Sequence, residues 1–326
     1  MKPKILTDKS RVEGCSLIGH HKYSNGHSVP IYDVSTTNAL NQIIGHVKFQ
    51  NADYGNVYYR GVRGLYDNVL PALMRGRVRG TPNDLTQTLN KIISDSYFKK
   101  SLKLFDTIIP KSDQDHYFNK KVKRYNKYFA EALLQHYAGS TRFLDVVDNH
   151  WVALWMGLHE FKTHGKKNEF YHSTKRSLSA WDLYEAHTER DVRLINKDIY
   201  AYILLIAMPY PISAPEYGIT ETDGFVEVDL RKALPSVYLR PHAQHALVIR
   251  KRDKDNINQV AHYYDMASQV TTILRVRIDR VIEWLGEGSL LTQDNLFPSP
   301  SIDQGYNNLL MHENIFKKPF DIKKYF

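Results

Sequence analysis

The chain has 326 residues, with 44 lysines and arginines against 35 aspartates and glutamates, which gives a formal net charge of +9. This length can bury a large core, and the positive charge favours an anionic partner such as nucleic acid, a nucleotide or anionic lipid. The single cysteine, Cys15, excludes an internal disulfide and fits a reducing compartment. Because no secretory signal and no apolar run of roughly 20 residues is present, we expect a cytoplasmic protein that does not enter a membrane.

The region before residue 51 is polar and mixed, and we expect it to form an N-terminal extension. The first strong strand pattern follows at 57–62, where Tyr59 and Gly61 face one side and Arg60 faces the other. An arginine in so aromatic a strand is expected to be partly buried and to need an anion, and Gly61 lets a backbone or a ligand approach closely. The alternative is an arginine at a strand edge in solvent.

Two helices are predicted next, separated by a break at 105–114. The first begins at Thr81, which is followed by a proline and, three residues after the cap, by an acid. The second runs from about His116 to Tyr137 and carries a basic face with interleaved tyrosines. This face is either a solvated surface or a contact for a phosphate backbone. As candidate nucleic-acid-binding residues it supplies Lys120, Lys121, Lys123, Arg124 and Lys127.

The segment 134–145, Leu-Gln-His-Tyr-Ala-Gly-Ser-Thr-Arg-Phe-Leu-Asp, is crowded with reactive groups. Gly139 can take the left-handed conformation that ends the preceding helix. An imidazole, a phenol, two hydroxyls, a guanidinium and a carboxylate within this short segment indicate a functional site. The alternative is that Arg142 pairs with Asp145 while His136 caps the helix end. The candidate residues are His136, Tyr137, Ser140, Thr141, Arg142 and Asp145.

The second half of the chain reads as strands mixed with short helices, which predicts an α+β domain over about 51–312. Asn149 caps a core helix, 162–198 is a possible insertion, and strands are expected near 199–207, 225–230, 246–250 and 271–278. Short helices are expected from 281 and near 302–313, and the basic tail at 313–326 is expected to be mobile. Pro241 argues against a helix in the cluster Arg240, His242, Gln244 and His245, so that a metal site on the two histidines is disfavoured.

Several common site patterns are missing from the sequence. It has no Gly-x-Gly-x-x-Gly, no Gly-x-x-x-x-Gly-Lys and no Gly-x-Ser-x-Gly, which disfavours a dinucleotide fold, a phosphate loop and a nucleophile elbow. The histidines at 20, 21 and 27 lack a cysteine or carboxylate at a ligand spacing, so we expect no metal site there.

Four motifs in order resemble the FRG-domain family, which takes its name from a Phe-Arg-Gly motif. They are Tyr59-Arg60-Gly61 with Leu70-Pro71 and Arg75, then Gln135-His136-Tyr137 through Thr141-Arg142-Phe143-Leu144-Asp145, then Arg240 with Gln244, and finally Leu296-Phe297-Pro298. The chain departs from the family pattern at Tyr59, which replaces the phenylalanine, and at His245, where the family commonly has glycine.

The order of these motifs is similar to that of ADP-ribosyltransferases, which implies a mixed sheet resembling their split sandwich and NAD as the substrate. On this resemblance Arg60 holds the pyrophosphate, Thr141 orients the nicotinamide ribose, and Tyr137 stacks on nicotinamide. Gln244 cannot act as a base, so Asp145 or His136 would move any proton. The implied catalytic residues are Arg60, His136, Thr141, Asp145 and Gln244, and the implied NAD-binding residues are Tyr59, Arg60, Gly61, Tyr137, Ser140, Thr141, Arg142 and Arg240.

The expectation from this resemblance is an intracellular toxin or phage-defence effector that transfers ADP-ribose, with RNA or DNA as a possible acceptor and an antitoxin or inhibitor protein as a possible partner. The alternative is a non-catalytic module that binds a nucleotide or RNA. A hydrolase that uses His136 and Asp145 is a weaker alternative, because no set of metal ligands accompanies them.

Overall fold

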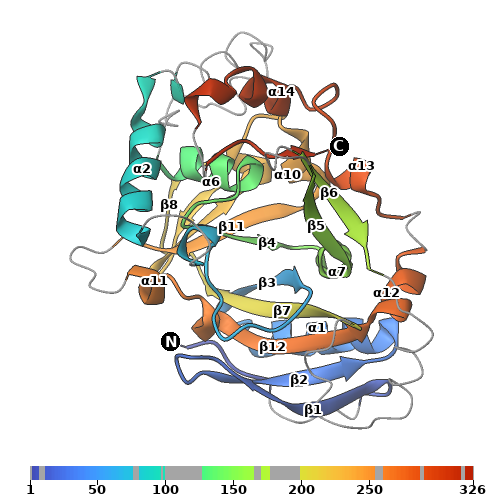
Figure 1. The fold of residues 1–326 in the computed structure, drawn as a ribbon. Helices are drawn as coiled ribbons and strands as arrows, with labels where there is room; N and C mark the ends of the chain where they lie inside the picture. The colour runs from blue at the N-terminus through green and yellow to red at the C-terminus, as the bar shows by residue number, and fades with distance from the viewer. Residues whose placement is uncertain are drawn as a thin grey trace.

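The computed structural model describes residues 2–6, 12–75, 81–96, 98–99, 127–164, 170–176, 199–253, 260–286, 290–316 and 320–325. These residues form an α+β fold around a large mixed sheet (Figure 1). None of the helices in these ranges has the length and apolar character needed to cross a membrane.

Ten strands make up the large sheet, in the order β1-β2-β12-β7-β3-β4-β11-β10-β9-β8. All neighbours run antiparallel except β2 and β12, which are parallel. β3 and β4 are joined by only one residue pair, Tyr59 with Val147, so the sheet consists of two halves with a narrow connection. In chain order the strands are β1 (Cys15–Lys22), β2 (Ser28–Val34), β3 (Gly55–Val62), β4 (Leu144–Val147), β7 (Tyr200–Pro209), β8 (Ser213–Glu216), β9 (Ile219–Glu221), β10 (Phe225–Asp229), β11 (Ala246–Lys251) and β12 (Val270–Arg277).

The helices are mostly short and connect or cover these strands (Figure 1). The α-helices are α1 (Thr37–Gln50), α2 (Pro82–Ser94), α6 (Lys127–Tyr137), α7 (His150–Leu158), α9 (Leu230–Ala233), α10 (Leu239–Ala243), α11 (Val260–Tyr263), α12 (Ile278–Trp284), α13 (Gln293–Leu296) and α14 (Gln304–Met311). The described residues also include the 3-10 helices η1 (Ala72–Met74), η3 (Ala267–Gln269) and η5 (Glu313–Ile315).

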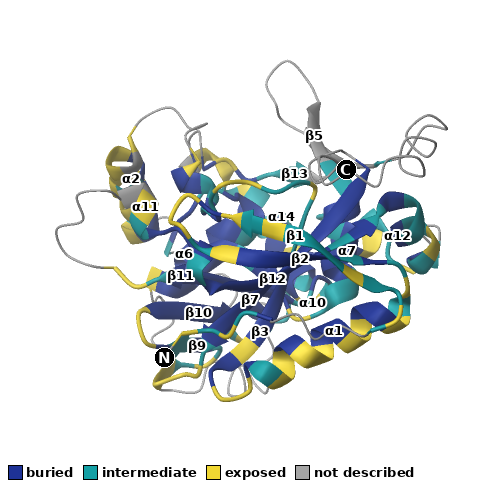
Figure 2. Ribbon diagram, turned by 90° about the horizontal axis from the view of Figure 1, so that it is seen from below, coloured by how far each residue is buried: buried dark blue, intermediate teal, exposed yellow. Residues whose placement is uncertain are grey.

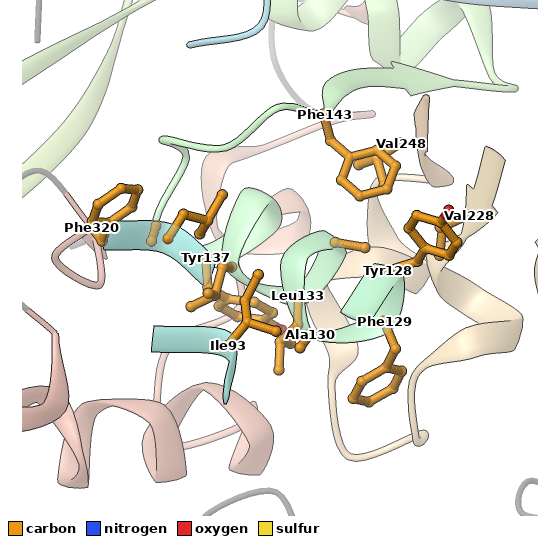
Figure 3. Packing of buried hydrophobic residues seen from close by; sticks show 14 of the residues in the cluster. Ile93, Tyr128, Phe129, Ala130, Leu133, Tyr137, Phe143, Val228, Val248 and Phe320 are labelled. Carbon is orange, nitrogen blue, oxygen red and sulfur yellow. The ribbon is translucent and has the colours of Figure 1, made fainter. Parts of the chain in front are cut away.

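Buried side chains gather on both faces of the sheet, because each strand points successive residues to opposite sides. On β3, Tyr58 belongs to the apolar cluster of one face, whereas Val57 and Tyr59 belong to a cluster of the other face under α1, α7 and α12. A third cluster lies under α2, α6 and α14, and Figure 3 shows its packing around Tyr137, Phe143 and Val248. Figure 2 shows that the central strands are buried while α1 exposes one side to solvent.

The region expected to be an N-terminal extension contributes to the sheet itself. β1 pairs with β2, and β2 pairs with β12, which lies more than 200 positions later in the chain. The boundary expected near residue 50 falls between α1 and β3, both of which pack in the same apolar cluster. The first half-sheet is therefore completed by residues from the start of the chain.

Residues 320–325, a described part of the basic tail, pack against the rest of the protein. β13 (Lys324–Tyr325) pairs in parallel with β6 (Phe170–Lys175), which pairs in turn with β5 (His159–His164) to form a small second sheet. Phe320 is fully buried in the cluster of Figure 3. The basic composition of the tail predicted mobility, but the aromatic residues among its lysines have an apolar surface to cover.

Local signals place several element ends correctly. Thr81 accepts a hydrogen bond from the backbone N–H of Asp84 at the start of α2, and Asn149 accepts one from Trp151 at the start of α7. The expectation that Pro241 prevents a helix was wrong, since α10 runs through it; proline is tolerated in the first turn, where its missing N–H needs no partner. The start of the second helix expected at His116 and most of the insertion expected at 162–198 lie outside the described residues.

Candidate functional site

Arg60 lies on the same face of β3 as Tyr58 and is partly buried. Its Nη1 donates to the backbone carbonyl of Asp145 on β4, at 2.5 Å. Burial and the nearby charge of Arg75 together lower the pKa of Arg60 to about 10, although the carboxylate of Asp145 acts in the opposite direction. Within the described ranges no carboxylate forms an ion pair with Arg60, so the partly buried cation has only a carbonyl dipole as its bonded partner.

Gln135 connects the two ends of the segment 134–145. Its Oε1 accepts from the hydroxyl of Thr141 at 2.7 Å, and its Nε2 donates to Oδ2 of Asp145 at 2.6 Å. The carbonyl of Thr141 accepts from the backbone N–H of Leu73, in the turn that follows β3. Arg60, Asp145, Gln135 and Thr141 are therefore joined in one hydrogen-bonded chain, although they come from separate stretches of the sequence.

Arg142 points elsewhere, into a buried network of charges. Its Nε and Nη2 both donate to the carboxylate of Glu131, at 2.9 and 2.7 Å, and its Nη1 lies 3.3 Å from Asp253. The alternative in which Arg142 pairs with Asp145 is wrong, because the carboxylate of Asp145 bonds to Gln135. With three guanidinium nitrogens engaged by protein groups, Arg142 is placed to hold the fold together.

His136, Tyr137 and Arg240 form a separate buried cluster. The guanidinium of Arg240 lies over the ring of Tyr137 at 4.3 Å, and its Nη1 donates to the carbonyl of His136 at 3.4 Å. The hydroxyl of Tyr137 donates to Asp303 at 2.7 Å. Tyr137 has no exposed surface, so its ring is used for packing inside the protein.

The imidazole of His136 is held in its neutral form. Burial lowers its pKa well below the ordinary value, and the charge of Arg240 lowers it further. Its Nε2 is buried, and none of the described groups bonds to it. Gln244 is also held in place, because its Nε2 donates to the carbonyl of Leu296 at 2.7 Å. The third motif is therefore hydrogen-bonded to the closing Leu-Phe-Pro motif. Neither of them belongs to the hydrogen-bonded group formed by Arg60, Asp145, Gln135 and Thr141.

The remaining residues of the implied NAD site are mostly packed against neighbours. Gly61 is required for packing, since a Cβ there would lie 1.8 Å from the carbonyl oxygen of Ala153 on α7. Tyr59 is 1% exposed and lies under the ammonium of Lys48. Ser140 is half-buried and follows Gly139, whose φ of +83° confirms the left-handed end expected for α6. Of these residues, Ser140 retains an accessible polar group.

The FRG domain family matches residues 55–166, which run from β3 to just past β5. The chain carries an FRG domain. No curated protein and no solved structure matches the chain. The matched range contains every member of the hydrogen-bonded chain from Arg60 to Thr141, whereas Arg240 and Gln244 lie outside it.

The departure from the FRG pattern at residue 245 has a clear conformational meaning. His245 has a φ of 51°, in the left-handed region that favours glycine. Its Nδ1 lies 3.2 Å from Asp148, which compensates in part for the strained backbone. A glycine at this position would therefore adopt the backbone conformation of the turn between α10 and β11 without strain. No cluster of three metal-ligating side chains occurs in the portion of the chain that the structure describes.

The proposed nucleic-acid face of the FRG-domain protein is described at only one of its members. Lys120, Lys121, Lys123 and Arg124 lie outside the described residues. Lys127, at the start of α6, forms an ion pair with Asp253 at 3.2 Å. Its side chain is 56% exposed, so the charge still faces solvent.

Several polar residues that organise the structure are absent from the predicted site residues. Glu131 and Gln135 lie on α6, four positions apart, so they are neighbours on one side of that helix. Glu227 lies in β10, where its alternation with apolar residues predicts a strand and does not mark a site. A buried acid within an amphipathic helix or strand was the available signal, because such a group requires a partner.

Proposed function

We propose that this FRG-domain protein is an NAD-dependent ADP-ribosyltransferase. The observation that carries the proposal is the environment of Arg60: a partly buried guanidinium, close to a second guanidinium at Arg75, without a carboxylate ion pair among the described residues. Two adjacent cations favour a doubly charged ligand, and a pyrophosphate accepts paired hydrogen bonds from arginine.

The residues around Arg60 suit such a ligand. Thr141 and Ser140 supply hydroxyls next to the turn that leads to Arg75, and the Gln135–Asp145 hydrogen bond fixes the position of Thr141. NAD would supply the glycosidic bond to nicotinamide, which breaks through an oxocarbenium-like state. Arg60 would bind the pyrophosphate, and Asp145 is the acid of this group that could accept a proton. His136 is disfavoured for that role because its neutral imidazole lies in the separate cluster with Arg240.

The narrow junction within the large sheet is a second observation that we take in support of this proposal. The split sandwich of ADP-ribosyltransferases has two sheets, and here one mixed sheet is divided into two halves that meet at a single residue pair between β3 and β4. Arg60 follows that pair directly on β3. The net charge of +9 supports a nucleic-acid acceptor, and a toxin or defence effector with an inhibitor partner is the corresponding biological role.

One observation favours the alternative, a binding module without catalysis. The hydroxyl of Thr141 and one carboxylate oxygen of Asp145 are both engaged by Gln135, so neither is set free for chemistry in this conformation. Arg60 would then bind a nucleotide or RNA phosphate without further reaction. Both functions predict loss of ligand on mutation of Arg60, and only one predicts transfer.

The test is incubation of the protein with NAD labelled in the ADP-ribose part and separate pools of RNA, DNA and protein. We expect label to be transferred to one pool, and Arg60→Ala to abolish this transfer. The matched control is Arg63→Ala, which removes an arginine three positions later that forms an ion pair with Glu160 and should keep full activity. NAD binding without transfer to any pool would support the binding module, and transfer by Arg60→Ala at the wild-type rate would refute the proposed site.

A further inference from the structure

A cleft of about 640 Å³ opens where the two halves of the sheet part. One wall consists of the start of β3 with the end of α1, and the other consists of β9, β10 and the short helix α9. Across the cleft, the hydroxyl of Tyr58 donates to Oε1 of Glu227 at 2.6 Å. Arg60 does not line this cleft, although its side chain lies on the same face of β3 as that of Tyr58.

Glu227 is the unusual group in this cleft. The residue is only 8% exposed, yet in the described parts of the chain no cation forms an ion pair with it. Its second oxygen, Oε2, neither accepts a hydrogen bond nor is enclosed by protein, so it faces the cleft. Burial raises the pKa of Glu227, and the nearby Asp229 adds to this effect. A nearly buried carboxyl oxygen that is open to a cleft can accept a hydrogen bond from a ligand that enters the cleft.

The other acids of the cleft are already neutralised. Arg231 bonds to Asp229 through Nε at 2.9 Å and to Asp148 through Nη1 at 2.7 Å. Lys232 lies 3.3 Å from Asp229 as well. The charges of these two cations and two acids balance one another, so they would not attract an organic cation, and Lys48 would repel it. A neutral donor such as a hydroxyl is therefore the better complement to Glu227.

Two further groups define the rest of the ligand. Lys48 lines the cleft from α1, and its Nζ lies 5.3 Å from the centre of the Tyr59 ring. None of the described carboxylates forms an ion pair with Lys48. Tyr210 lies at the cleft with 52% of its surface exposed, and its hydroxyl donates to the carbonyl of Ala52, which fixes the ring. A fixed, half-exposed aromatic ring offers a flat surface to a sugar or a base.

We propose that this cleft binds a phosphorylated sugar, with sugar hydroxyls on Glu227 and the phosphate on Lys48. The shared chemistry is a phosphate attached to a ring that carries free hydroxyls, and the ligand is either a simple sugar phosphate or a nucleotide whose base lies on Tyr210. The site does not depend on the proposed function, because none of these three residues takes part in the group formed by Arg60, Gln135 and Thr141.

The test is calorimetric titration of the whole protein with AMP, ribose 5-phosphate, adenosine and inorganic phosphate. We expect Glu227→Gln to weaken AMP and ribose 5-phosphate about tenfold or more and to leave inorganic phosphate unchanged, because the amide removes a charged acceptor for the hydroxyls. Lys48→Met should weaken both phosphorylated sugars and leave adenosine unchanged. Lys91→Met, on the exposed face of α2, is the matched control and should bind as the wild type does.

The comparison of AMP with ribose 5-phosphate separates the two sources of ligand, since only a nucleotide should weaken on Tyr210→Leu. The titrations are repeated in Arg60→Ala, which should keep AMP binding in the cleft even if transfer of ADP-ribose is lost. Failure of all four probes to bind, or AMP affinity that is unchanged in both Glu227→Gln and Lys48→Met, would overturn the proposal. Binding that depends on Glu227 in a protein that transfers no ADP-ribose would overturn the proposed function and leave this site standing.

Discussion

Replacing Arg142 by methionine tests whether this arginine stabilises the fold or binds a ligand. Its side chain is 5% exposed and donates from two guanidinium nitrogens to the fully buried carboxylate of Glu131. The backbone N–H of Arg142 donates to the same carboxylate. The resemblance to ADP-ribosyltransferases instead implies that Arg142 binds NAD. Methionine retains the length and apolar stem of the side chain but removes every donor, so the variant isolates the ion pair.

The expected loss of stability follows from what the substitution leaves behind. Without Arg142 the described cation nearest to Glu131 is Arg250, whose Nη2 lies 3.8 Å away and whose Nη1 bonds to Asp253 at 2.7 Å. Burial alone raises the pKa of Glu131, and the two arginines together hold it below the ordinary value. Breaking a buried ion pair from one side costs about 3–5 kcal/mol, and we expect Arg142→Met to lower the free energy of unfolding by that amount.

Urea unfolding at 25 °C and neutral pH, followed by far-UV circular dichroism, measures this loss. The matched control is Arg63→Met, which breaks the more exposed ion pair with Glu160 and should cost at most about 1 kcal/mol. The double variant with Glu131→Gln should lose less than the sum of the two single variants, because each single change strands the other group.

A loss below about 1 kcal/mol for Arg142→Met would refute the reasoning. If that variant also lost the stabilisation that NAD gives to the wild type, Arg142 would be a ligand of NAD, as the resemblance implies. A large loss of stability combined with an unchanged response to NAD at a temperature where the variant is folded would confirm the structural role.

Three further predictions concern single positions. Gly61→Ala should lower the free energy of unfolding by about 3 kcal/mol or more, because the new Cβ would overlap the backbone of α7. The control is Gly45→Ala, on the exposed side of α1, where a Cβ would have no neighbour within 4 Å; in the same urea titration it should raise the free energy of unfolding by up to about 1 kcal/mol. His245→Gly should raise it by about 1 kcal/mol by relieving the left-handed backbone, and a lower unfolding midpoint would show that the contact with Asp148 matters more. Burial, with a contribution from Lys48, lowers the pKa of His150 from 6.5 to about 4. Between these pH values the unfolded chain binds a proton that the folded chain does not, so stability should fall as the pH drops from about 6.5 to 4. Thermal unfolding across that range should show a smaller fall for His150→Gln than for the wild type.

Much of the local structure can be read from the sequence because its causes lie within a few residues. The Thr81 cap with Pro82 predicts the start of α2, and the confirmed left-handed Gly139 predicts the end of α6. The apolar run at 199–207 predicts β7, which is buried over nearly its whole length. The four motifs identified the FRG domain, whose match covers the first two. Each of these signals is a residue type acting on its own backbone or on its own helix turn.

Partners are decided by the tertiary structure, because a side chain bonds to whatever the fold brings within about 3 Å of it. Glu131 and Asp145 are both acids close in sequence to Arg142, and the sequence does not show which of them is its partner. In the structure Arg142 pairs with Glu131, whereas Asp145 bonds to Gln135. The partner of Tyr137 is Asp303, 166 positions away. The single-pair junction between β3 and β4 likewise results from long-range strand order, and with it the cleft at Glu227. The sequence by itself thus determined many of the local elements and the resemblance to the FRG domain, whereas burial and strand pairing determined which polar groups meet.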